Sequence, residues 1–268
     1  MNQAKVKVDE GLLMNVLHTA SRHGLPSLAS EVLTQMEKQN LPLHEHHIVH
    51  ILDACAANGD IKQAFQTLDL WCASGKSPTL ADARSILSAI QRDPDSIDMA
   101  YGYLEELKET GQTIDVVAVN VIIQAAVFLN DLQRAVGTYK AMGNLDVKPD
   151  ATTFNLLLKA CVNVEHRELG DGLFSEMKAA HIRPNSETYK HLISLNLTQS
   201  DYEESFYYLE EMKAKGLKPP LSCYDAIIRK CVSTGDTRYR LAMEELEQMG
   251  YVVPHSLLAL VEGRANVH

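Results

Sequence analysis

A unit of about 35 residues recurs along this chain, and no other feature of the sequence restricts the possible folds as strongly. The two clearest copies, residues 119–150 and 154–185, match in length and in the order of their apolar and polar positions. Each copy closes on a basic residue, a proline and then Asp150 or Asn185. A period of this length is typical of repeat architectures, in which each unit buries its apolar face against the next.

Seven units can be counted, and each has the apolar pattern of a helical hairpin. With Val117 taken as the first residue of a unit, the third, sixth, seventh and tenth positions are apolar in nearly every copy, which places them on one face of a helix. A second amphipathic stretch follows a polar or glycine break, and a proline near the end of most units stops it. The units begin near Gly11, His46, Ala81, Val117, Thr152, Glu187 and Ser222.

The hairpins are expected to stack, because a single hairpin cannot bury both of its apolar faces. The pattern therefore predicts an all-α solenoid of about seven helix-turn-helix repeats over residues 11–254. Residues 1–10 form a short N-terminal extension. Residues 255–268 resemble the start of an eighth first helix, which we expect to act as a partial cap over the open end of the array.

Composition and charge exclude several classes of protein. The formal net charge of −10 argues against a protein that binds polyanions over its whole surface, although it permits a local basic face. Five cysteines without close pairs do not form a disulfide framework and indicate a reducing compartment. No apolar run approaches the roughly 20 residues that span a bilayer, so no membrane partner is expected. The opening MNQAKVKVDEG is neither a secretory signal nor an Arg-rich transit peptide, which favours a cytosolic or nuclear chain, or one whose targeting segment has been removed.

The repeat resembles that of the pentatricopeptide repeat family. The resemblance is carried by the 35-residue period, an Asn at the fourth position of two units, a glycine-type break, an E-M-K ending and a final K-P-D. The tetratricopeptide family is a near neighbour, but its period is 34 residues and the recurring Pro-Asp or Pro-Asn ending does not suit it. The resemblance covers about seven units from Gly11 to Pro254 and implies a right-handed superhelical solenoid.

What this resemblance implies is a reader of single-stranded RNA, in which the first helices line a groove and two side chains per unit select one base. The two side chains are the fourth residue of a unit and the Asp or Asn that closes it. Asn120 with Asp150 matches the family's pair for uracil, and Asn155 with Asn185 matches a pair for pyrimidines that favours cytosine somewhat over uracil. An amide offers a donor and an acceptor to a base edge, and a short polar neighbour can hold that amide in one orientation.

Other predicted RNA contacts are less specific than these two pairs. Val117 and Thr152 lie where the family places the small side chains that pack between successive bases. The remaining units lack a pair that can be decoded, and we expect them to hold phosphates or to bind protein. Their candidate residues are Arg84 with Asp115, and Lys190. Lys159, in the first helix of a central unit, is a further candidate contact.

The distribution of charge bears on which partner the groove can take. The first helices carry about as many basic as acidic residues, so most of the negative charge belongs to second helices, linkers and ends. A nearly neutral groove permits RNA but predicts weak non-specific affinity and a shallow dependence on salt. The acidic runs are either a solvated outer face or an acidic convex face that docks a basic protein partner.

Metal and catalytic chemistry have little support in the sequence. His44, His46, His47 and His50 form a cluster, and two of them lie one helical turn apart, but no third ligand and no metalloprotease Glu accompany them. We therefore expect no metal, and histidines that are exposed or face the groove. Cys55, Cys161 and Cys231 recur at the tenth position of their units, and they are predicted to be core residues, as is Trp71. No catalytic or cofactor-binding motif is present, so neither an enzyme nor a cofactor is expected.

Two functions follow from these observations. The first is a single-stranded RNA-binding protein that takes a uracil and a pyrimidine at its central repeats and acts in organellar RNA stability, processing or translation. Family habit alone indicates the mitochondrion. The alternative is a non-catalytic scaffold that binds a protein partner, as a ribosome-associated or complex-assembly subunit would.

Overall fold

The computed structural model describes residues 10–39, 41, 44–73 and 75–265, and every regular element in these ranges is a helix. The expected all-α helical-repeat architecture is confirmed. Two compact units divide the chain, Met1–Pro149 and Asp150–His268. Among the described residues, no helix is long and apolar enough to cross a membrane.

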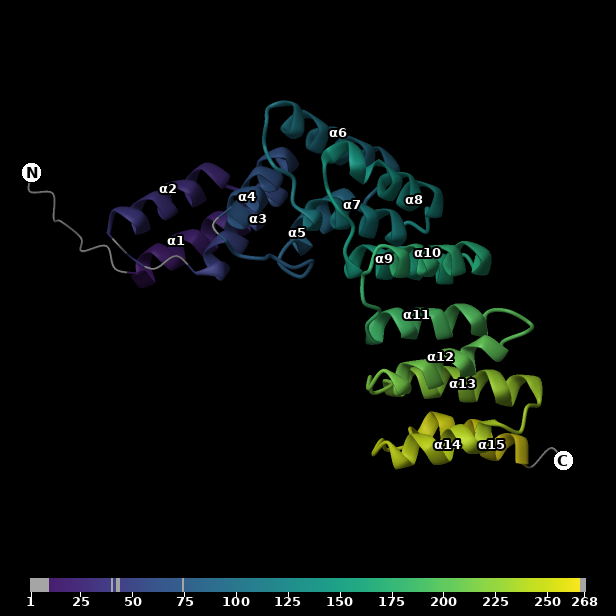
Figure 1. Cartoon of the computed structure of the whole chain (residues 1–268). Coiled ribbons are helices and arrows are strands. Elements are labelled where there is room, and N and C mark those ends of the chain that lie inside the picture. The colour runs from purple at the N-terminus through teal and green to yellow at the C-terminus, as the bar shows by residue number, and fades with distance from the viewer. Residues whose placement is uncertain (1–9, 40, 42–43, 74, 266–268) are drawn as a thin grey trace, which may run out of the picture. The chain divides into compact units, whose positions relative to one another are not determined.

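The first unit contains four helical hairpins (Figure 1). Its helices are α1 (Glu10–His23), α2 (Pro26–Lys38), α3 (Glu45–Asn58), α4 (Ile61–Ala73), α5 (Arg84–Ile90), α6 (Pro94–Glu109), α7 (Val116–Phe128) and α8 (Leu132–Ala141), which continues into a short 3₁₀ helix, η1 (Met142–Leu145). Successive first helices pack on one another, α1 on α3, α3 on α5 and α5 on α7, and the second helix α4 packs on α6. The first helices of this unit therefore form one continuous layer.

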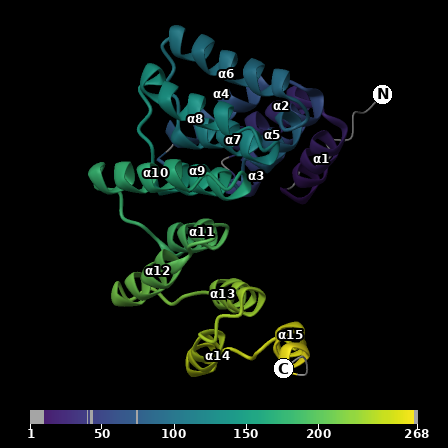
Figure 2. The ribbon, with the colours of Figure 1, turned by 90° about the vertical axis from the view of Figure 1, so that its right-hand side faces the viewer.

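The second unit repeats this arrangement with three hairpins and a final single helix. Its helices are α9 (Ala151–Asn163), α10 (Arg167–Ala179), α11 (Ser186–Leu197), α12 (Glu203–Ala214), α13 (Leu221–Thr234), α14 (Tyr239–Gln248) and α15 (His255–Ala265). The first helices again pack in order, α9 on α11, α11 on α13 and α13 on α15. Figure 2 shows α11, α13 and α15 on one side of this unit and α12 and α14 on the other.

The two ends of the chain are only partly described. Glu10 opens α1, and the rest of the expected N-terminal extension, residues 1–9, lies outside the described residues. At the other end α15 packs on α13 as a further first helix would, and residues 266–268 lie outside the described part of the chain.

Most first helices begin one residue before the unit starts counted from the sequence, but α5 does not. It begins at Arg84, three residues after the expected start at Ala81. The reason is a turn held by Asp82, whose Oδ2 accepts hydrogen bonds from the backbone N–H of Thr79 over 2.8 Å and from the Thr79 hydroxyl over 2.7 Å. This turn replaces the first turn of the helix, and α5 is therefore only seven residues long.

The interior of the hairpins matches the apolar pattern of the sequence. Cys55, Cys161 and Cys231 are fully buried free thiols, and Trp71 is buried, so their predicted place in the core is confirmed. In two hairpins of the second unit, a side-chain hydrogen bond also joins the first helix to the second. The hydroxyl of Tyr189 donates to Oε1 of Glu211 over 3.1 Å, and that of Tyr224 donates to Oε1 of Glu245 over 2.8 Å.

Candidate nucleic-acid interface

Asn155 and Asn185, which the sequence pairs as one base-reading unit, are joined by a hydrogen bond in the structure. Asn155 lies about one turn inside α9, and Asn185 immediately precedes the first residue of α11. Nδ2 of Asn155 donates to Oδ1 of Asn185 over 3.2 Å. The packing of α9 on α11 brings these two residues together across 30 positions of sequence.

Asn185 also forms the N-terminal cap of α11. Its Oδ1 accepts the backbone N–H groups of Glu187 and Thr188, each over 3.0 Å. In return the backbone N–H of Asn185 donates to Oγ1 of Thr188 over 3.1 Å, which completes a capping box. The residue that closes one unit therefore starts the first helix of the next.

Thr188 completes the contacts of the Asn155 amide. Its hydroxyl donates to Oδ1 of Asn155 over 2.7 Å in a buried position. The side chain of Asn155 is consequently held at both its oxygen and its nitrogen, and the residue is 5% exposed. A fixed amide of this kind can present its remaining donor and acceptor in one arrangement.

The two residues of the second predicted pair, Asn120 and Asp150, belong to different compact units of the chain. Asn120 lies in α7 of the first unit and is 1% exposed. Asp150 begins the second unit and caps α9, where its Oδ1 accepts the backbone N–H of Thr153 over 2.8 Å and its own N–H donates to Oγ1 of Thr153 over 3.1 Å. This capping box has the same form as the one at Asn185. The pairing of Asn120 with Asp150 stays a prediction of the repeat pattern.

Arg84 and Asp115 are not brought together. Arg84 is an exposed residue at the start of α5, whereas Asn155, at the same position of its unit, lies a turn further into its helix. Asp115 caps α7 by accepting the backbone N–H of Val117 over 2.8 Å. No hydrogen bond or ion pair joins Arg84 to Asp115.

Val117 and Thr152, the predicted packing positions between bases, differ in exposure. Val117 is buried in α7, at 8% exposure, and Thr152 is half-buried in the first turn of α9. Glu187 holds the equivalent position in α11 and is exposed. Of these three positions, only Thr152 offers a small side chain that is open to solvent.

Two of the predicted phosphate contacts, Lys159 and Lys190, lie on neighbouring first helices of the second unit. Lys159 is exposed on α9 and makes no ion pair with any described residue. The Lys190 ammonium lies 3.8 Å from Oε1 of Glu187, which partly balances its charge.

His191 is a buried residue beside the same Glu187 oxygen, and its Nε2 lies 3.6 Å from that oxygen. The pKa of His191 is lowered to about 4, mainly by burial and also by the nearby charges of Lys190 and Lys159, while Glu187 opposes the shift.

The histidine cluster packs at the start of α3. The rings of His46 and His47 lie 4.1 Å apart between centroids, and those of His44 and His46 lie 5.5 Å apart. His47 departs from the expectation of histidines that are exposed or face the groove, because it is fully buried and its Nδ1 accepts the backbone N–H of His44 over 3.0 Å. Burial lowers the pKa of His47, and the neighbouring His46 and His44 lower it further. In the described ranges no group of three or more His, Cys, Asp or Glu residues has the arrangement of a metal site.

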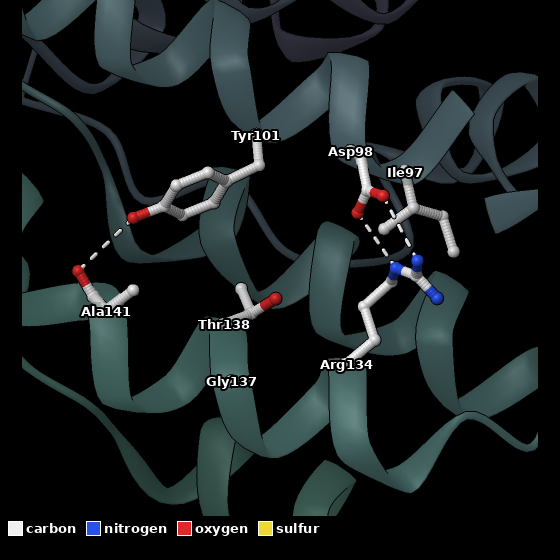
Figure 3. Close-up of a pocket in the computed structure, with 7 residues that line it drawn as sticks. All are labelled: Ile97, Asp98, Tyr101, Arg134, Gly137, Thr138 and Ala141. Carbon is white, nitrogen blue, oxygen red and sulfur yellow. Dashed lines mark hydrogen bonds and ion pairs between the residues drawn. The ribbon is translucent and has the colours of Figure 1, made fainter. Parts of the chain in front are cut away.

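A cavity of about 370 Å³ lies in the first unit between α6 and α8 (Figure 3). Its polar groups bond mainly to each other. Arg134 donates from Nε and Nη2 to the two carboxylate oxygens of Asp98 over 2.8 and 3.0 Å, and the Tyr101 hydroxyl donates to the Ala141 carbonyl over 3.4 Å. The cavity belongs to second helices, so it is separate from the first-helix positions that the sequence predicts to contact RNA. It is lined by Ile97, Asp98, Tyr101, Arg134, Gly137, Thr138 and Ala141.

The acidic second helices of the second unit use several of their charges internally. Glu203 pairs with Arg238 over 2.6 Å, and Lys213 bridges Glu210 on its own helix and Glu245 on α14. These carboxylates stabilise contacts within and between second helices. They are therefore less available to a basic partner than the acidic runs in the sequence suggest.

Sequence reasoning missed the residue that holds Asn155 from its second side. Thr188 was not among the predicted contacts, and neither was Thr153, its counterpart in the preceding unit. A partial signal for both exists in the sequence, since Asp and Asn are preferred N-cap residues, and each is followed three positions later by a side chain that can hydrogen-bond back to the cap. The pattern occurs at Asp150 with Thr153 and at Asn185 with Thr188.

The chain is similar to known repeat families in both sequence and fold. The family model described as "Pentatricopeptide repeat-containing protein" matches residues 10–142, and the model described as "Pentatricopeptide repeat domain" matches residues 172–234. The two matches together span most of the chain. No curated protein sequence matches the chain.

Three solved structures of low sequence identity share the fold. Maize PPR10 in complex with an 18-nt psaJ RNA element has a TM-score of 0.52 and 18% identity, over 91% of this chain and 41% of PPR10. Yeast Rmd9p in complex with a 16-nt target RNA has a TM-score of 0.56 and 12% identity, over 99% of this chain and 59% of Rmd9p. The PPR domain of the Arabidopsis thaliana protein-only RNase P 1 in complex with tRNA has a TM-score of 0.56 and 17% identity, over 69% of this chain and 98% of that domain. The chain therefore spans 41% of the length of PPR10 and 59% of that of Rmd9p.

Proposed function

This chain belongs to the pentatricopeptide repeat family, and we propose on that premise that it binds single-stranded RNA along the first helices of its hairpins. In this proposal Asn155 with Asn185 reads one pyrimidine, and Asn120 with Asp150 reads the uracil that precedes it. Exposed basic side chains such as Lys159 contact phosphates and add affinity that is independent of sequence.

The observation that carries the proposal is the fixed amide of Asn155. Its Nδ2 donates to Asn185 and its Oδ1 accepts from Thr188, so only one N–H and one oxygen lone pair remain uncommitted. A base edge is recognised by an adjacent donor and acceptor of this type.

The solved structures support the same class of ligand. PPR10 and Rmd9p were each determined with bound RNA, and the PPR domain of protein-only RNase P 1 was determined with tRNA. We carry that ligand class to this chain as a proposal. The nearly neutral first helices lead us to expect modest affinity, with most of the discrimination supplied by the two central pairs.

The biological role belongs to the proposal as well. We propose that the protein acts in an organelle, the mitochondrion by family habit, where it protects, positions or presents a transcript without cleaving it. Localisation of the tagged full-length protein tests the compartment. Labelled single-stranded RNA incubated with the protein and Mg²⁺ should be recovered at full length, and cleavage that purifies with the protein would contradict the non-catalytic part of the proposal.

Selection from random RNA tests the binding function directly. The protein is incubated with a random single-stranded library at moderate salt, bound RNA is recovered over several rounds, and the enriched sequences are compared with those recovered by the Asn155→Ala variant. We expect enrichment of a uracil followed by a pyrimidine, and loss of the preference at the second base in the variant.

Crosslinking in cells followed by RNA sequencing identifies the transcript. Absence of enrichment in the selection, together with recovery of one stoichiometric protein partner from cells, would contradict RNA reading and favour the scaffold function. The acidic second helices would then be the first surface to map.

A further inference from the structure

The Thr188 hydroxyl has a single proton, and its neighbours determine where that proton goes. The backbone N–H of Asn185 donates to Oγ1 over 3.1 Å, so the hydroxyl accepts on that side. Two oxygens can receive its proton, Oδ1 of Asn155 at 2.7 Å and Oδ1 of Asn185 at 3.1 Å. Oδ1 of Asn185 already accepts two backbone N–H groups and Nδ2 of Asn155. The shorter contact, to Asn155, therefore takes the proton.

The same contacts fix which way the Asn155 amide points. The orientation of Asn185 is set by the cap, because its Oδ1 accepts backbone N–H groups of α11. If the Asn155 amide flipped, its oxygen would lie about 3.2 Å from Oδ1 of Asn185, and two acceptors would face each other in a partly buried site. The flip would also remove an acceptor from the Thr188 hydroxyl. Asn185 and Thr188 together thus hold one of the two amide orientations.

Amide orientation matters because uracil and cytosine present opposite patterns. Uracil offers an N3–H donor beside an O4 acceptor, and cytosine offers an N3 acceptor beside an N4–H₂ donor. An amide that can flip complements both bases, whereas a fixed amide complements one better than the other. Discrimination between the two pyrimidines therefore depends on what prevents the flip.

We propose that Thr188 is a positioning residue that sets the preference of Asn155 between cytosine and uracil. The proposal rests on the RNA-binding function proposed above and names the determinant of its specificity. Thr188 lies on α11, the first helix of the unit after the one that reads the base. The base specificity of one repeat then depends on a side chain of the repeat that follows it.

The test compares two short RNAs that differ only by cytosine or uracil opposite Asn155. Thr188→Val keeps the shape of the side chain and removes the hydroxyl. We expect the ratio of the two dissociation constants to move towards unity by about twofold or more, because the variant loses one of the two contacts that hold the amide while Asn185 still opposes the flip. Affinity for the preferred RNA should change less than the ratio does. Thr188→Ser restores the hydroxyl and should restore the ratio.

Two controls separate positioning from stability. Thr198→Val removes a hydroxyl at the other end of α11, where Oγ1 donates to the Leu195 carbonyl over 2.7 Å, and should leave the ratio unchanged. Thermal unfolding of each variant shows how much stability is lost. A wild-type ratio retained in Thr188→Val, or lost equally in Thr198→Val, would overturn this inference alone. Failure of the wild-type protein to bind either RNA would overturn the proposed function and this inference with it.

Discussion

Gly170 faces Leu195 where α10 packs on α11, and a Cβ atom added to Gly170 would lie 2.2 Å from Cδ2 of Leu195. Leu195 is fully buried, so its side chain would have to shift within the core to admit a Cβ atom. The absence of a side chain at Gly170 therefore allows the two helices to approach closely. Two residues further along α10, Gly172 is exposed, and a Cβ there would meet nothing within 4 Å.

These two glycines give a matched prediction about stability. Gly170→Ala should lower the free energy of unfolding by about 1–3 kcal/mol, because the added methyl group overpacks a dense interface. Gly172→Ala should raise it by about 0.5–1 kcal/mol, because alanine favours a helix without creating a contact. Urea unfolding followed by circular dichroism measures both variants. Effects of the same sign would show that the close approach of α10 and α11 is not as described.

His191 should make the stability of the protein depend on pH. Its pKa in the folded state is about 4, below the usual 6.5, and burial is the largest cause of this shift. Between these values the unfolded chain binds a proton that the folded chain does not, so stability falls as the pH decreases through this window. The loss attributable to His191 is at most about 3 kcal/mol and is complete below pH of about 4.

The measurement is the difference between the wild-type protein and His191→Gln, taken from urea unfolding at several pH values from about 7 to 4. Titrating groups that do not contact His191 contribute equally to both proteins, so the difference reports His191 together with its contact to Glu187. We expect the wild-type protein to lose more stability than the variant as the pH falls. Parallel stability curves would contradict the prediction.

Lys159 should act on RNA through charge alone. It is exposed on α9 and makes no ion pair with a described residue, whereas Lys190 is partly balanced by Glu187. Lys159→Gln should weaken binding to all RNA sequences by a similar factor and reduce the slope of log affinity against log salt by up to about 0.7, the value expected for one phosphate contact on a single strand. Lys190→Gln should produce a smaller change in the slope.

Binding titrations at three salt concentrations distinguish these outcomes. A change in base preference for Lys159→Gln would mean that the residue reads a base instead of a phosphate. Equal effects of the two lysine variants would show that Glu187 does not balance the charge of Lys190 when RNA binds.

Asn120→Thr should change the first base of the selected RNA. By analogy with the family's pairing, Thr with Asp150 favours a purine, so the preference should shift from uracil towards guanine while the second base stays a pyrimidine. Selection from the same random library, run in parallel with the wild-type protein, measures both positions. An unchanged first base would exclude Asn120 as a reading residue, and a change at the second base would show that the two pairs are not independent.

The helical repeat could be predicted from the sequence because it depends on periodicity, which every unit repeats. The same argument placed Cys161 and Trp71 in the core, where both are buried. It failed locally at α5, where the Asp82 turn delays the helix to Arg84, because a side-chain hydrogen bond of this kind leaves the apolar period unchanged.

The contacts at Asn155 were only partly predictable. Family pairing indicated Asn185, but not that Asn185 would also cap α11. The role of Thr188 depends on how closely α9 and α11 approach each other. That distance is set by the packing of two successive repeats rather than by either repeat alone. The buried state of His191 has the same origin, since hydropathy does not predict a buried histidine beside two lysines.

The cap formed by Asn185 has a consequence for any attempt to retarget this protein to another transcript. Because Oδ1 of Asn185 holds the first turn of α11 as well as the Asn155 amide, a substitution there alters helix initiation and base choice at once. Asn155 does not cap a helix, and its two hydrogen bonds go to the side chains of Asn185 and Thr188. Reprogramming is therefore least disruptive at Asn155, with Asn185 exchanged only for Asp, Ser or Thr, which also cap helices well.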